Sequence, residues 1–336
     1  MKHKKMIAVA LGAQLMLSAC TTLSLAPSSS LQSLYDYQLI DSQSRASVSV
    51  AQTAKALADQ DVIFIGEHHT HPGAHLLQMQ LFQALYQQNP NLVLSLEQFS
   101  RPHQSVLNGY LNAKYGEETL IKEGEAWENY KSSYRPLVEF AKDHNLPVIA
   151  ANAPIMHVRC VGQQGIEVLN KIPQEQRAWS SQKLNLEIKK YKDKFFQFLQ
   201  DAGSKHGQLS EKQQQRMQNT YAAQLLRDTT MAESIQQAIV ANPKAQIVHL
   251  NGSFHSDAHL GTVAVLEHIM PELSVSVISP VFIENADLHT IKQQDFAQGE
   301  YLLALKPLPP RYLDEQKEQV AVSALIKKRM AEKCEF

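Results

Sequence analysis

Two segments of the chain carry the same short motif, in which a glycine is followed three residues later by a histidine. Gly66 precedes His69, and Gly252 precedes His255. Glycine lets the backbone turn sharply at the end of a strand. An imidazole can bind a metal ion or transfer a proton near neutral pH. The repeated motif therefore marks two places where the chain could perform chemistry.

Two glutamates follow short apolar runs in the same way, Glu67 in the first motif and Glu97 further along the chain. With His69 and His255 they form a set of two carboxylates and two imidazoles. Such a set could bind a divalent metal ion, or it could run acid–base chemistry without a metal. The structural alternative for each residue is a helix cap, a local ion pair or a packed core histidine.

The elements that must position these residues are indicated by short, continuous apolar runs, which are typical of buried parallel strands. Helical patterns over 75–87 and 136–144 separate the first runs, and this alternation predicts an α/β fold with a mainly parallel central sheet flanked by helices. Ligands bind beyond the carboxyl ends of such strands, so we expect the polar tails to converge in one crevice. The predicted strands are 61–65, 92–96, 147–150 and 246–250, with 275–278 and 301–305 as further candidates.

Two long segments do not follow this alternation. Residues 101–134 and 155–239 are polar and helical in pattern. Long helical segments between strands can form a layer of their own. We therefore predict a smaller helical subdomain, or cap, over the sheet.

The start of the chain has the pattern of a bacterial lipoprotein signal. A basic segment over 1–5 is followed by an apolar run over 6–17 and then by Leu-Ser-Ala-Cys, which ends at Cys20. The run is too short for a permanent membrane span. We predict a signal peptide over 1–19 and lipidation of the Cys20 thiol, which would anchor the protein stably through its acyl chains. By resemblance to other bacterial lipoproteins, Thr21 indicates the outer membrane, with the protein on its periplasmic side.

After the signal peptide, we predict a lipidated tether rich in Ser, Thr and Pro over 20–33 and one folded domain over 34–336. A net charge of −1 and a hydrophobic content of 44% are ordinary for a globular protein and give no indication of nucleic-acid binding. No second apolar run could cross a membrane. Cys160 and Cys334 could pair in an oxidising compartment, but two unpaired cysteines are at least as compatible with the sequence.

Longer motifs resemble the ChaN-like family of haem-binding lipoproteins, which are iron-regulated and related to haem uptake. The likeness spans roughly residues 55–280, and its motifs occur in order. They are residues 66–69, 75–78, 97–99, 134–141, 146–152, 224–232 and 251–255. The resemblance implies a parallel-sheet domain with a small helical domain. It also implies haem (iron-protoporphyrin IX) held between two protomers, with a tyrosine on the iron and with His and Lys from the partner chain near the propionates.

On this resemblance Tyr134 is the expected iron ligand, because it lies in the strongest family-like segment. Tyr130 is the second candidate and Tyr221 the third, and Trp127 could stack on the porphyrin or simply pack in the cap. A phenolate is a hard anionic donor that suits ferric haem. The candidates for the propionate histidine are His69, His75 and His255. The sequence singles out no lysine.

The leading hypothesis is therefore a membrane-anchored binding protein for haem or iron acquisition or storage. It would form a haem-dependent homodimer, and an outer-membrane haem receptor is a candidate partner. The rival hypothesis is a metal-dependent hydrolase of the esterase or peptidase kind, because the repeated motif also resembles those of erythromycin-esterase-like and Tiki-like hydrolases. Its catalytic residues would be Glu67, His69, Glu97 and His255. A third hypothesis is a protein contact made by a lipoprotein whose pocket is vestigial.

Overall fold

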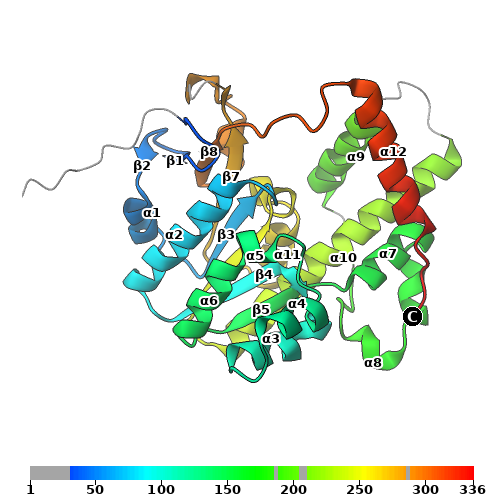
Figure 1. Cartoon of the computed structure of the whole chain (residues 1–336), viewed down its shortest axis with the longest axis horizontal. Helices are drawn as coiled ribbons and strands as arrows, with labels where there is room; N and C mark the ends of the chain where they lie inside the picture. The colour runs from blue at the N-terminus through cyan, green and yellow to red at the C-terminus, as the bar shows by residue number, and fades with distance from the viewer. Residues whose placement is uncertain (1–30, 185–187, 204–209, 285–287) are drawn as a thin grey trace, which may run out of the picture.

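The computed structural model describes residues 31–184, 188–203, 210–284 and 288–336. The predicted signal peptide and Cys20 lie outside these residues. Within them the chain forms one eight-stranded sheet with the order β2-β1-β8-β7-β3-β6-β4-β5 (Figure 1). The strands are β1 (Tyr37–Asp41), β2 (Ser47–Val48), β3 (Val62–Glu67), β4 (Leu92–Ser100), β5 (Val148–Asn152), β6 (Gln246–Gly252), β7 (Val275–Phe282) and β8 (Tyr301–Leu305).

The strands from β8 to β5 pair in parallel, whereas β1 pairs antiparallel with both β8 and β2. All six predicted strands are present. Every residue of β3 and β6 is buried, as expected for strands with helices on both faces. The predicted α/β class with a mainly parallel sheet is therefore confirmed.

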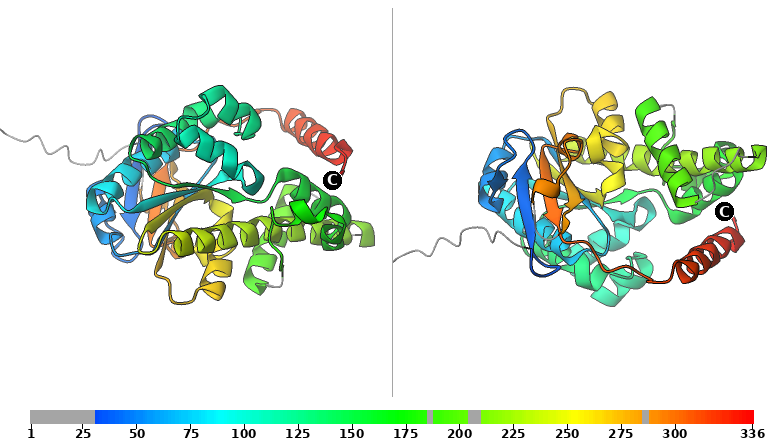
Figure 2. Two further views of the ribbon diagram at one scale, coloured as in Figure 1. Left: turned by 90° about the horizontal axis from the view of Figure 1, so that it is seen from below. Right: turned by 90° about the horizontal axis from the view of Figure 1, so that it is seen from above.

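Helices cover both faces of the sheet (Figure 2). One face packs its core under α1 (Val50–Ala56), α2 (Pro72–Gln88) and α6 (Arg135–Asp143). The opposite face packs under α11 (Thr262–Ile269) and the carboxyl-terminal half of α10 (Glu211–Ala241). Helix α2 begins three residues before the predicted start at 75, because the His71 ring accepts a hydrogen bond from Gly73 N at 3.2 Å and caps the helix.

The two segments predicted to form the cap lie in different places. Residues 101–134 form η1 (Arg101–His103), α3 (Gln104–Leu111), α4 (Glu117–Glu123) and α5 (Tyr130–Ser133), whose apolar side chains join the main core. The second segment forms a helical arm beside the sheet (Figure 1). The arm consists of α7 (Ile155–Gln164), η2 (Ile166–Lys171), α8 (Gln174–Arg177), α9 (Lys189–Gly203) and the first half of α10.

The tail of the chain returns to this arm. After β8, an extended segment leads to α12 (Glu315–Ala331), and Cys334 then forms a disulfide with Cys160 of α7 across a Cα–Cα distance of 5.0 Å. The pairing that the sequence left open is therefore present. Among the described residues, no helix is both long enough and apolar enough to cross a membrane.

Candidate functional site

The polar tails of three strands meet at one edge of the sheet. Glu67 at the end of β3 is in register with Gly252 at the end of β6. The backbone N–H of Gly252 donates to Glu97 Oε2 of β4 at 2.7 Å. The predicted convergence of these tails in one place is therefore confirmed, and we call the group formed by Glu67, His69, Glu97, Asp228 and His255 the strand-end cluster.

Glu67 is the centre of a buried hydrogen-bond network. Its Oε1 accepts from His69 Nδ1 at 2.9 Å, from the Tyr134 hydroxyl at 2.5 Å and from Gln98 Nε2 at 3.1 Å. Its Oε2 accepts from Gln78 Nε2 at 2.5 Å. Burial alone would raise the pKa of Glu67, but the His69 hydrogen bond and the neighbouring histidine charges lower it overall. The carboxylate is thus held in its charged form.

His69 is the member of the cluster that a ligand can reach from outside. Its side chain is 42% exposed, and its Nδ1 is hydrogen-bonded to Glu67. The opposite side of the ring lies over Gly252, where a Cβ atom would come within 2.8 Å of Nε2. The Trp127 ring stands edge-on at a centroid distance of 4.9 Å. Burial lowers the pKa of His69, but the hydrogen bond to Glu67 and the charge of Glu97 raise it overall.

The two remaining candidate histidines are buried. His75 places Nδ1 at 3.0 Å from Gln78 Oε1 and Nε2 at 3.0 Å from the carbonyl oxygen of His69. Both of its ring nitrogens are therefore engaged within the protein. His255 places Nδ1 at 2.6 Å from Asp228 Oδ1, while its Nε2 is 3.5 Å from Glu97 Oε1.

Asp228 is a member of the cluster that the sequence did not single out. It is fully buried in α10 and also accepts from the Tyr191 hydroxyl at 2.8 Å and from Thr262 Oγ1 at 2.9 Å. Burial lowers the pKa of His255, but the charges of Asp228 and Glu97 raise it overall. The only sequence signal for Asp228 was its place inside the family-like segment 224–232.

The three candidate tyrosines are all buried. Tyr134 has no exposed surface, and its hydroxyl donates to Glu67; burial and the Glu67 charge raise its pKa. The Tyr130 hydroxyl is buried without a hydrogen-bond partner among the described residues, and burial raises its pKa as well. Tyr221 lies in the arm beside Tyr191 and Phe195. None of these three tyrosines is exposed in this conformation.

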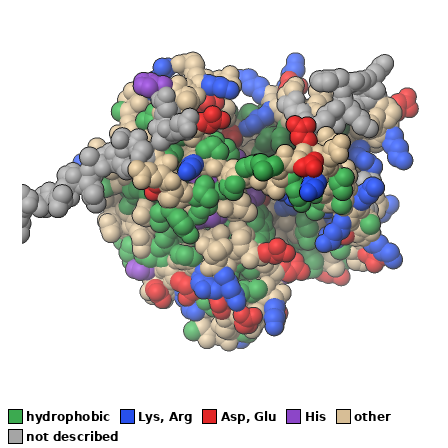
Figure 3. All heavy atoms as spheres, turned by 45° about the horizontal axis from the view of Figure 1, so that its top comes forward, with side chains coloured by type: hydrophobic (Ala, Val, Ile, Leu, Met, Phe, Trp, Pro, Cys, Tyr) green, Lys and Arg blue, Asp and Glu red, His purple; other side chains and the backbone are tan. Residues whose placement is uncertain are grey.

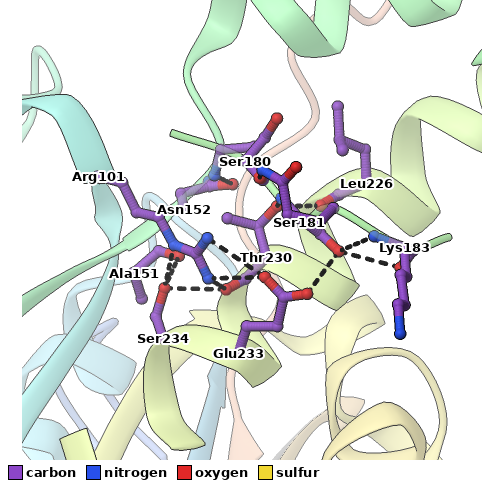
Figure 4. A network of polar contacts seen from close by, with 12 residues as sticks. Arg101, Ala151, Asn152, Ser180, Ser181, Lys183, Leu226, Thr230, Glu233 and Ser234 are labelled. Atoms are coloured by element: carbon purple, nitrogen blue, oxygen red, sulfur yellow. Dashed lines mark hydrogen bonds and ion pairs between the residues drawn. The ribbon is translucent and has the colours of Figure 1, made fainter. Parts of the chain in front are cut away.

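Other polar groups near the cluster have structural roles. His249 inside β6 is buried against Phe64, with Nδ1 at 2.9 Å from Ser95 Oγ, and burial lowers its pKa to about 3. His249 is therefore a core residue. At the end of β4, Arg101 donates to Ser234 Oγ at 2.8 Å and to the Thr230 carbonyl at 2.7 Å (Figure 4). This network fastens the sheet to α10.

The geometry of the strand-end cluster offers acid–base chemistry. Among the residues that the structure describes, no group of three or more His, Cys, Asp or Glu side chains could hold a metal ion. The cluster instead consists of two histidine–carboxylate units, one formed by His69 with Glu67 and one by His255 with Asp228.

Fold and site together define an α/β protein with a carboxylate–histidine cluster at the strand ends, beside a helical arm. The sequence matches the family described as haem-binding uptake, Tiki superfamily, ChaN over residues 53–266, which is more than half of the chain. The chain belongs to this family. The predicted resemblance is therefore confirmed, and the family identifies haem as the ligand. A search of the curated proteins finds no relative.

Solved structures match the chain at low sequence identity. ChaN of Campylobacter jejuni, described as showing cofacial heme binding, superposes with a TM-score of 0.59 and 15% identity, over 81% of this chain and 97% of that one. A mutant of the erythromycin esterase EreC in its open conformation gives a TM-score of 0.44 and 12% identity, over 81% and 82%. The likeness to the Campylobacter jejuni protein shows the fold alone.

Proposed function

We propose that this protein is a membrane-anchored haem-binding lipoprotein that acquires or stores haem iron, and that His69 is the side chain offered to the iron. The observation that carries the proposal is the half-exposed His69 ring, whose Nδ1 is held by the buried Glu67 carboxylate at 2.9 Å. Haem, when bound, would supply an iron that takes a nitrogen or oxygen donor. In this conformation, His69 is the candidate donor that combines exposure with a fixed orientation.

The residues behind His69 fit this role. A ligating histidine usually donates its other N–H to a carboxylate, which fixes the tautomer and the ring orientation. Glu67 does this for His69, so that Nε2, which lies beside Gly252, is the ring nitrogen that would carry the lone pair. Tyr134 and Gln78 donate to the same carboxylate. In this proposal Tyr134 positions Glu67, whereas iron ligation by Tyr134 would require its hydroxyl to leave Glu67.

We further propose a haem-dependent homodimer. His69 is half-exposed beside the Trp127 ring, and a second copy of the chain could cover a haem bound there. The cofacial arrangement described for the Campylobacter jejuni protein is compatible with two haems stacked at such an interface. The dimer would then enclose haem that an outer-membrane receptor delivers.

The proposed location is the periplasmic side of the outer membrane, where Cys20 would carry the lipid anchor. The Cys160–Cys334 disulfide supports export, because disulfides persist in oxidising compartments and are rare in the cytosol. Mass spectrometry of the mature protein tests the anchor. An acylated amino-terminal peptide that begins at Cys20 is expected, and an unmodified Cys20 would contradict it.

The haem proposal is tested by titrating the protein with ferric haem and recording the Soret band, with the size measured alongside. The wild type should shift the band and move from monomer towards dimer. His69→Ala should lose the shift, whereas His144→Ala, which removes an exposed histidine from the end of α6, should bind as the wild type does. No spectral change at micromolar haem would refute the proposal. Loss of binding in Tyr134→Phe with full binding in His69→Ala would transfer the ligand role to Tyr134.

A second candidate function is hydrolysis by acid–base chemistry, and one observation favours it. His255 lies between Asp228 at 2.6 Å and Glu97 at 3.5 Å, an arrangement in which a carboxylate orients an imidazole that could activate water. Ester hydrolysis by the purified protein that is lost in His255→Ala would establish this function. The absence of hydrolysis over a panel of esters and peptides would leave the binding role alone.

A further inference from the structure

Helix α9 packs one of its faces against a single aromatic ring beside the strand-end cluster. This ring belongs to Phe254 in η3 (Ser253–His255), and it directly precedes His255. Four side chains of α9 contact the Phe254 ring, and their spacing of three or four residues places them on one face of the helix. They are Tyr191, Phe195 and Phe198, with ring centroids at 5.8, 5.8 and 5.4 Å, and Lys194, whose Nζ lies 4.7 Å from the ring centroid.

This contact is one of the places where the arm meets the sheet and its flanking helices, which we call the sheet body. Helix α9 lies beside α10 in the arm (Figure 1), and its rings pack around Tyr221 of α10. On the face drawn in Figure 3, a recess separates the sheet body from the arm, so the two parts are not packed together along their whole length. The segment of the body that α9 does cover is the one that carries His255.

A hydrogen bond joins the same face of α9 to the strand-end cluster. The Tyr191 hydroxyl donates to Asp228 Oδ2 at 2.8 Å, and the other oxygen of this carboxylate lies 2.6 Å from His255 Nδ1. Gln224 Nε2 in turn donates to the Tyr191 hydroxyl at 3.0 Å. Tyr191 and His255 are both buried. Helix α9 therefore covers the histidine and is bonded to the carboxylate that orients it.

The docked helix also buries an ammonium group that is poorly compensated. Lys194 Nζ is buried without a hydrogen-bond partner among the described residues, and it lies 3.9 Å from Asp257 Oδ2, its ion-pair partner. Burial lowers the pKa of Lys194 and raises the pKa of Asp257, so both charged forms are disfavoured there. The desolvation of a buried pair can exceed its Coulombic attraction. The aromatic face and the Tyr191 hydrogen bond thus favour the docked position of α9, whereas the buried ammonium opposes it.

An element held by opposing contributions can populate two positions. We propose that α9 is a lid over His255, latched by the hydrogen bond from Tyr191 to Asp228, and that a ligand reaches the His255–Asp228 pair only when α9 lifts from Phe254. In the docked position His255 is 6% exposed, which closes its ring to a substrate. The strand-end cluster then has an open half at His69 and a gated half at His255. The lid goes beyond the proposed haem binding and would control the second candidate function, hydrolysis at His255.

The experiment measures the rate at which diethyl pyrocarbonate modifies His255 in the full-length protein without haem, by mass spectrometry at one fixed pH. Tyr191→Phe removes the latch and should raise this rate about 10–100-fold, because a hydrogen bond to a charged group is lost. Phe198→Ala removes a half-exposed ring from the contact with Phe254 and leaves the cluster untouched, and it should raise the rate several-fold. Lys190→Met removes an exposed ammonium from the same helix and should leave the rate unchanged.

A double variant tests the contribution that opposes docking. Lys194→Met combined with Asp257→Asn replaces the weakly paired charges with neutral side chains of similar size. The His255 rate should fall about tenfold, because the docked position no longer buries an ammonium. An unchanged or faster rate would show that the buried charge does not oppose docking, and it would overturn the lid as proposed.

His249 distinguishes the lifting of α9 from a loosening of the whole protein, because it is fully buried in β6 against Phe64 and Ser95. Its rate should lie below the wild-type His255 rate and stay the same in every variant. The proposal is overturned if the two rates rise together, if wild-type His255 reacts as slowly as His249, or if Tyr191→Phe and Phe198→Ala leave the His255 rate unchanged. A protein that shows the expected rates and binds no haem would refute the proposed function and leave the lid intact.

Discussion

The most direct test of the site is a single methyl group placed at Gly252. The backbone there has φ −56° and ψ 131°, which alanine adopts without strain. The Cβ atom of alanine would nevertheless come within 2.7 Å of His69 Cε1 and 2.8 Å of Nε2. The ring is half-exposed, so we expect Gly252→Ala to push it outwards and break its hydrogen bond to Glu67.

The expected loss of haem affinity follows from the hydrogen bond between His69 and Glu67 that would be broken. A hydrogen bond to a charged group contributes about 1.5–3 kcal/mol, and loss of a partner that orients a metal ligand typically weakens metal binding about 10–100-fold. We therefore expect haem affinity to fall by about 10–100-fold. The free energy of unfolding should fall by no more than about 3 kcal/mol, since Glu67 keeps three other donors.

The assay is a Soret titration combined with urea denaturation. The control is Gly116→Ala, where the added Cβ would meet no atom within 4 Å, and it should match the wild type in both measurements. Wild-type haem affinity in Gly252→Ala would show that the position of His69 does not matter for binding and would refute the reasoning. Equal weakening in Gly116→Ala would point to a general effect of losing glycine.

Three further predictions concern titration and hydrogen bonding. The pKa of His69 is raised, so a proton should compete with iron for its ring at a higher pH than for an ordinary histidine. Haem affinity measured by Soret titration should therefore fall as the pH drops through that raised pKa. His259 lies between Glu300 and a second glutamate, and its pKa is raised to about 9, chiefly by the hydrogen bond to Glu300. The stabilising contribution of charged His259 should be complete below pH 6.5 and disappear as the pH rises through about 9. In urea denaturation, His259→Gln should therefore lower the free energy of unfolding by about 1 kcal/mol at pH 6 and leave it unchanged at pH 10. Tyr134→Phe removes one donor to Glu67 and should lower the free energy of unfolding by about 1–2 kcal/mol while the Soret shift persists.

Much of the fold could be predicted because buried parallel strands are apolar throughout. The runs that became β3, β4, β5 and β6 are short and continuous, and the residues directly after them determine what the sheet edge presents. Parallel pairing then brings Glu67, Gly252 and Glu97 together without further information. The meeting of these tails was therefore predictable from local pattern and a general property of such sheets.

The remaining features of the site depend on contacts between distant parts of the chain, which local sequence pattern does not encode. Asp228 lies within a helix of 31 residues, and which face of it meets His255 depends on how the helix packs. Tyr134 stands between α5 and α6, and its burial follows from the same packing. Cys160 and Cys334 are separated by 174 residues, so only the path of α12 brings them together. Family likeness could suggest a tyrosine, but it could not show that the hydroxyl is occupied by Glu67.

Helix α10 determines where the protein can be truncated. At 1.5 Å per residue its 31 residues extend over about 46 Å. One half builds the arm, the other half seals a face of the sheet, and Asp228 lies between the two. The arm is therefore not a detachable module. A truncation that removed it at a loop would also strip Ile235 from the core and leave His255 without its carboxylate, so a minimal version of the protein would need a cut within the helix itself.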